Sequence, residues 1–152
     1  MNELFFKRIS HLFNVNSLNA FEKVFLNSVM LYSKAAFTSA PVEKLIYILA
    51  ALESILLKNE SEPIQQNLSE RLAFFIAEEL ADRKHIIKTV KSIYAIRSKY
   101  LHHGHYTHSE LGTMSDFMLL VFNFFMKLTA NLEKFKTKDE FICEIDDYKL
   151  AG

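Results

Sequence analysis

Apolar residues recur every three or four positions along most of this 152-residue chain, a spacing typical of amphipathic helices. The apolar stripes and the polar breaks between them predict main helices over about residues 20–37, 42–57, 68–80, 83–100 and 107–135. Shorter helices are predicted over residues 3–13 and after Thr137. Three predicted starts have a polar residue followed three positions later by Glu, which is typical of a capping box: Asn67 with Glu70, Thr107 with Glu110, and Thr137 with Glu140.

The composition favours the all-α class, because only 3 Gly and 2 Pro accompany 14 Phe. Few residues are therefore suited to the tight turns of a many-stranded sheet. We predict a helical bundle of about five main helices plus short terminal helices, in one domain over residues 1–152. The predicted core consists of Leu49, Leu52, Ile55, Phe75, Ile86, Val90, Ile93, Val121 and Phe124.

The last long helix is apolar around more than one face, through Phe117, Leu120, Val121, Phe124, Phe125 and Leu128. Such a helix is either central in its own bundle or shared with a second subunit. The sequence leaves both interpretations open.

Charge is balanced in total but unevenly distributed. Eighteen basic residues cancel eighteen acidic ones, so net charge does not indicate a nucleic-acid partner. However, residues 83–109 hold six Lys or Arg and five His without any Asp or Glu, whereas the acids lie mainly within 43–82 and 138–147. Most charge runs are solvated helix faces. An anionic ligand is the functional interpretation of this one.

The cysteine count, the N-terminus and the length of the apolar runs indicate the cellular compartment. The single cysteine, Cys143, excludes an internal disulfide and a cysteine-based zinc site. The N-terminus lacks the apolar core and cleavage site of a signal peptide. The longest uncharged apolar run, 117–126, is shorter than the roughly 20 residues that span a bilayer. We therefore expect a cytoplasmic protein without a membrane partner.

The acid-free segment contains the residues that most directly suggest chemistry. Arg97 is followed by His102, His103 and Gly104. Arginine binds phosphate bidentately, and histidine can accept and donate a proton near neutral pH. Together they can cleave RNA without a metal, since a base must activate the ribose 2′-hydroxyl and an acid must protonate the leaving oxygen.

Arg97 continues the apolar stripe, being four residues after Ile93, so it must meet a carboxylate, a ligand or a groove. His102 lies about 140° further round an ideal helix, so the two converge only if the helix ends or bends near Leu101. His103 is an alternative partner. Arg97 could instead be a structural ion-pair residue beside a solvated histidine loop.

Zinc binding by His102, His103, His105 and His108 is a third interpretation, because zinc accepts imidazole ligands. No acidic residue or cysteine lies beside these histidines, and we expect neither a metal nor another cofactor.

Glu53 follows Leu49 by four residues, on the inward stripe. A buried carboxylate is tolerable only when it is paired, so we predict a pair with Arg97 or Arg71. The alternative is a solvated Glu53 at the edge of the stripe.

Over residues 42–135 the chain resembles an Apea-like HEPN domain, a group found in prokaryotic defence and related proteins. The resemblance rests on segments 51–56, 69–73 and 93–104. The HEPN signature is Arg, four to six residues, then His, which fits Arg97 with either His102 or His103. Ser98 stands where many members have Asn. Residues 1–40 would form an N-terminal helical extension.

The resemblance implies an all-helical, commonly dimeric bundle whose Arg–His pairs face each other across the dimer. Active members are metal-independent endoribonucleases, and inactive ones are dimerisation or binding modules. For this chain it implies Arg97 and His102 as catalytic residues acting on single-stranded RNA. The candidate accessory residues are His103, Ser98, Lys99, Tyr100 and Glu53. An RNA substrate, a homodimer, and an antitoxin or sensor are the implied partners.

Overall fold

The computed structural model describes residues 2–151 and is built from helices. They are α1 (Asn2–Asn14), α2 (Ala20–Phe37), α3 (Pro41–Leu56), α4 (Ile64–Ile76), α5 (Leu80–His103), α6 (His108–Asn131), the 3₁₀ turn η1 (Leu132–Lys134) and α7 (Lys138–Ala151). No strand occurs within this range. The predicted all-α class is therefore confirmed.

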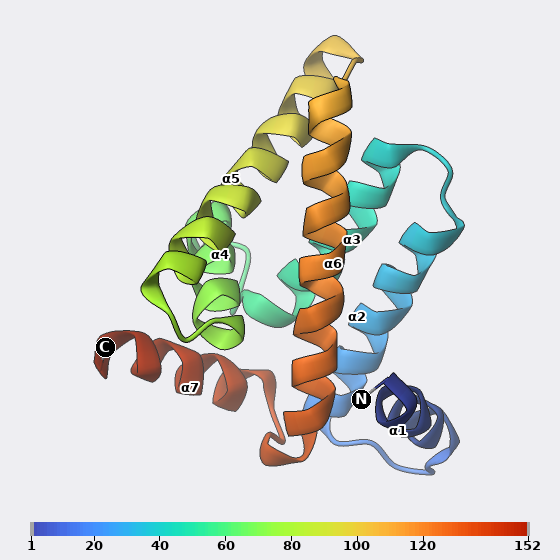
Figure 1. Cartoon of the computed structure of the whole chain (residues 1–152). Helices are drawn as coiled ribbons and strands as arrows, with labels where there is room; N and C mark the ends of the chain where they lie inside the picture. Colours follow the sequence, from blue (N-terminus) through green and yellow to red (C-terminus); the bar gives the residue numbers. More distant parts are fainter. Residues whose placement is uncertain (1, 152) are drawn as a thin grey trace.

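Helix α6 runs through the middle of the bundle and contacts α1, α3, α4 and α5 (Figure 1). Helices α2 and α3 pack against each other on one side, and α4 packs between α5 and α7 on the other. The ends of α5 and α6 that meet at residues 104–107 extend beyond the other helices. This projecting end carries the Arg–His motif.

Two of the three predicted capping boxes are formed. Thr107 and Glu110 exchange side-chain and backbone hydrogen bonds at the start of α6, and Thr137 and Glu140 do so at α7. The prediction for Asn67 is wrong, because α4 already begins at Ile64. Pro63 has a φ of −62°, which suits the residue preceding a helix, and its carbonyl accepts the Asn67 N–H at 3.0 Å.

The core is close to the predicted one. Eight of the nine predicted residues are buried, and the exception is Phe75. Phe75 is half-buried at the core edge, where its ring packs edge-to-face on Phe124 and Phe141. The helical pattern correctly predicts that Phe75 faces the core, but it does not show that Phe75 lies at the edge of the core.

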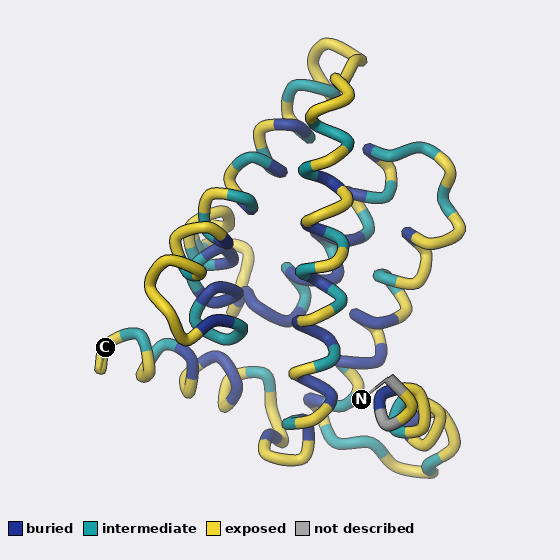
Figure 2. Tube along the Cα trace, in the orientation of Figure 1, coloured by how far each residue is buried: buried dark blue, intermediate teal, exposed yellow. Residues whose placement is uncertain are grey.

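Helix α6 is central but not enclosed. Its buried residues include Phe117, Val121 and Phe124, whereas Leu119 is 62 % exposed, and exposed and buried segments alternate along the helix (Figure 2). By length and composition, His108–Lys134 could cross a membrane, a test that core helices of soluble proteins also pass. In this fold α6 supplies the central face of the bundle.

Arg71 is the charged residue most deeply buried in the fold, at 3 % exposure. Its guanidinium donates to both oxygens of Glu62 at 2.9 Å and both oxygens of Asp146 at 3.0 Å. A fifth bond, of 2.7 Å, reaches the Leu56 carbonyl. The hydrogen bond from Arg71 lowers the pKa of Glu62. Arg71 thus joins α4, the α3–α4 loop and α7.

Replacing Arg71 should be among the most destabilising charge changes in this protein. Arg71→Met removes the guanidinium that binds both carboxylates: Glu62 loses its salt bridge, and Asp146 keeps the more exposed Lys58 at 3.1 Å. This should cost about 3–5 kcal/mol of unfolding free energy. Urea titration followed by circular dichroism measures the loss. Lys7→Met is the control, because Lys7 forms an exposed pair with Glu3 on α1, worth about 0–1 kcal/mol. Equal losses in the two variants would contradict this role for Arg71.

Candidate functional site

The candidate site lies on the projecting end of α5, which the turn into α6 holds in place. Gly104 adopts the left-handed conformation, with φ +71°, and donates its N–H to the Tyr100 carbonyl at 2.7 Å. Across the turn, Lys99 binds Glu110 at 3.0 Å. The hydrogen bonds from Lys99 and from the Thr107 N–H lower the pKa of Glu110. Residues 101–109 are all exposed around this framework (Figure 2).

Arg97, Ser98 and His102 share one shallow hollow of about 240 Å³ on the flank of α5. Tyr94 and Leu101 complete its lining. The helix continues two residues past Leu101, to His103, and ends at Gly104. Arg97 and His102 therefore border the same hollow from different sides of one continuous helix.

Arg97 has no structural partner among the described residues. It is half-buried, and its Nε atom is fully buried without a hydrogen-bond partner. No carboxylate in the described part of the chain lies within 4 Å of its guanidinium. The interpretation of Arg97 as an ion-pair residue is therefore not supported, and of the predicted alternatives the groove is the one observed.

The predicted pair between Glu53 and an arginine is wrong. Glu53 is half-buried and accepts the Tyr94 hydroxyl at 2.8 Å, while Arg71 is occupied by Glu62 and Asp146. Burial raises the pKa of Tyr94 well above its usual range, and the bond to Glu53 adds to the effect. The Arg97 charge lies close enough to oppose it. Glu53 thus influences the hollow through Tyr94.

The other candidate residues point elsewhere. Lys99 is held by Glu110, and Tyr100 packs on Tyr106 with ring centroids 6.1 Å apart. His103 is exposed beyond the hollow, with its ring 6.2 Å from that of His105. Of the candidates, only Arg97, Ser98 and His102 line the hollow.

The four histidines at the projecting end, His102, His103, His105 and His108, are not arranged as a metal site. Among the side chains that the structure describes, no group of three or more His, Cys, Asp or Glu is arranged to hold a metal ion. The four tip histidines are exposed along the end of α5, the turn and the start of α6.

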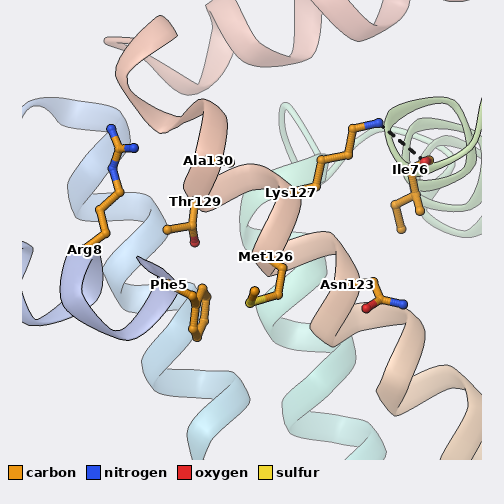
Figure 3. Close-up of a pocket in the computed structure, with 8 residues that line it drawn as sticks. All are labelled: Phe5, Arg8, Ile76, Asn123, Met126, Lys127, Thr129 and Ala130. Atoms are coloured by element: carbon orange, nitrogen blue, oxygen red, sulfur yellow. Dashed lines mark hydrogen bonds between the residues drawn. The ribbon is translucent and has the colours of Figure 1, made fainter. Parts of the chain in front are cut away.

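A second hollow, of about 390 Å³, lies between α1, α6 and the end of α4 (Figure 3). Phe5 and Met126 form apolar parts of its wall. Both basic side chains of this hollow already have partners within the protein. Arg8 forms a salt bridge with Glu133, and Lys127 lies over the Phe75 ring and donates to the Ile76 carbonyl. It contains no pair of groups suited to proton transfer.

Sequence reasoning overlooked Tyr94 and Leu101 as parts of the site. Tyr94 lies three residues before Arg97 and therefore on an adjoining part of the same face. Its hydroxyl was the available signal, because a half-buried tyrosine usually finds a polar partner. Leu101 occupies the equivalent place one turn after Arg97.

Comparisons of the chain with protein-family models, with curated proteins and with solved structures found no match. The functional argument consequently depends on the residues of this chain.

The pair of Lys99 with Glu110 should stabilise the turn between α5 and α6 locally and not the whole fold, so its loss should affect only the amides of that turn. In Glu110→Ala, the Thr107 N–H loses its acceptor, so the amides of residues 104–110 should exchange hydrogen faster while those of Val90 and Ile93 stay protected. Because folding lowers the pKa of Glu110, the protection is complete above its unfolded pKa of about 4.3 and is lost as pH falls through the lower folded value.

Hydrogen exchange detected by NMR, corrected for intrinsic rates, measures both effects. Glu144→Ala is the control, since Glu144 is exposed on α7. Unchanged exchange at Thr107 in Glu110→Ala would contradict the holding role of Glu110.

Proposed function

We propose that this protein is a metal-independent endoribonuclease of HEPN type that cleaves single-stranded RNA. One observation carries the proposal: a half-buried arginine without a protein partner shares a hollow with an exposed histidine. A cation held partly out of water without a carboxylate is suited to an anionic ligand. The surrounding segment, residues 83–109, contains no acid that would repel phosphate.

The chemistry assigns one role to each side chain. Arg97 holds the scissile phosphate and stabilises the charge that develops on its oxygens. His102 acts as a general acid/base, removing the proton of the 2′-hydroxyl or supplying one to the 5′-oxygen that leaves. The attacking 2′-oxygen bonds to phosphorus as the bond to the 5′-oxygen breaks, which yields a 2′,3′-cyclic phosphate and a 5′-hydroxyl.

One chain supplies half of this machinery, because the reaction needs both a base and an acid. A two-fold homodimer that brings two copies of the hollow together provides two histidines and two arginines. Leu101 supports this arrangement, since it lines the hollow and is 61 % exposed, so a second subunit could cover it. By the HEPN resemblance, the dimer acts in the cytoplasm within a prokaryotic defence or toxin system, regulated by an antitoxin or sensor.

A second candidate function is a non-catalytic dimerisation or binding module with the same fold. The observation favouring it is that His102 is exposed and no hydrogen bond joins it to Arg97 within the described part of one chain. The enzyme and the module differ in whether RNA is cut.

The ribonuclease proposal predicts that cleavage depends on two residues and not on their neighbour. With labelled RNA in excess EDTA, Arg97→Ala and His102→Ala should each reduce the cleavage rate by about 10²-fold or more. His103→Ala is the matched control and should cut at the wild-type rate, because His103 lies outside the hollow. Thermal unfolding confirms that each variant is folded.

Two results would overturn parts of this assignment. Loss of cleavage in His103→Ala but not in His102→Ala would transfer the role to the neighbouring histidine. A wild-type protein that cuts no RNA, and is not toxic on expression, would favour the binding module.

Dimerisation is a separate prediction. At micromolar concentration, light scattering should give about twice the 17.7 kDa chain mass. Leu101→Glu should shift the protein towards monomer and reduce cleavage together, because it places a charge where the two hollows meet. Ile46→Glu is the control, an exposed apolar position on α3. A wild-type monomer at this concentration would contradict the composite site.

A further inference from the structure

The outer face of α5 carries a row of exposed positions that ends at the candidate site. The row consists of Lys84, Lys88, Lys91, Ala95, Ser98 and His102, and all six residues are exposed. Lys84 and His102 are about five turns apart at 3.6 residues per turn, so they point in the same direction, separated by about 27 Å along the axis. Three lysines and the candidate catalytic histidine therefore lie on one straight line.

The three lysines are not used by the fold. None of them lies within 4 Å of a carboxylate in the described part of the chain, unlike Lys58, Lys99 and Lys149. Lys91 is close enough to Glu70 for its charge to contribute to the lowered pKa of that carboxyl. Glu70 itself binds Lys149 at 2.8 Å. The lysine charges thus face solvent.

The surface between the lysines is an open trough of about 520 Å³. Ile87, Ser92 and Ala95 line it together with Lys84, Lys88 and Lys91. No aromatic side chain lines it, so bases have nothing to stack on. Its polar lining is mainly lysine, which suits a phosphate backbone held by charge and not by base recognition.

We propose that this row is a track that binds the backbone of single-stranded RNA and leads it to the hollow of Arg97 and His102. This inference rests on the proposed ribonuclease for its direction, since the track ends at Ser98 and His102. It adds a substrate property: RNA several nucleotides long binds better than a dinucleotide, with little dependence on sequence.

The test compares two triple variants. Lys84→Gln, Lys88→Gln and Lys91→Gln together remove the track, whereas Lys23→Gln, Lys34→Gln and Lys136→Gln remove three exposed lysines elsewhere. Binding of a fluorescent oligo(U) that carries 2′-O-methyl groups, and so cannot be cut, is measured by anisotropy over a range of KCl concentrations. The substitutions are at exposed helical or loop positions, and circular dichroism verifies the fold.

The track variant should bind about tenfold more weakly or worse at low salt, and the slope of log K against log[KCl] should become shallower by about 2, at roughly 0.7 per lost contact. The control variant should match wild type. Equal binding by the two variants would overturn the track. So would tighter binding of duplex RNA or polyaspartate with the same lysine dependence, because the site would then serve a different class of polyanion.

Cleavage separates this inference from the proposed function. If wild type cuts RNA, the track variant should lose activity on long RNA and keep it on a dinucleotide, and equal activity on long RNA would overturn the track. If wild type cuts nothing but the track variant alone loses binding, the ribonuclease fails and the track is retained as an RNA-binding surface.

Discussion

The buried stripe of α5 is the constraint on which the site depends. Ile86, Val90, Ile93 and Ile96 face the core, and this fixes the rotation of the whole helix. Arg97 follows Ile93 by one turn, so it lies at the edge of the core and its side chain is partly withdrawn from water. His102 and the lysines fall on the opposite, solvent-facing side. The helix continues beyond the last buried contact to His103, so its end projects with the hollow exposed.

Two arginines of this fold differ in whether the protein itself neutralises their charge. Arg71 is buried and saturated by two carboxylates and a carbonyl, so it stabilises the junction of α4 with α7. Arg97 is half-buried, and its Nε has no partner. Withdrawing a cation from water without pairing it is unfavourable, and a bound phosphate would relieve that cost. The contrast supports a structural role for Arg71 and a ligand for Arg97.

Local patterns were sufficient for much of the fold. Helix stripes, the Thr107 and Thr137 caps and eight core residues depend on neighbours within about two turns, which the sequence displays directly. Predictions failed where the structure depends on a residue that the prediction did not consider. Pro63 set the start of α4 in place of Asn67, and Glu53 found Tyr94, a partner 41 positions away, in place of an arginine. Of the predicted site residues, Arg97, Ser98 and His102 share the hollow, whereas Lys99 is removed by its bond to Glu110.

The chemistry of the cut ends tests the central claim most directly. If His102 activates the 2′-hydroxyl while Arg97 stabilises the phosphate, wild-type protein in excess EDTA should leave 2′,3′-cyclic phosphate and 5′-hydroxyl ends, identified by mass spectrometry. An oligonucleotide with a 2′-deoxy sugar at the cleavage position should resist cutting. Products with 3′-hydroxyl and 5′-phosphate ends, or cleavage of the 2′-deoxy substrate, would contradict the account.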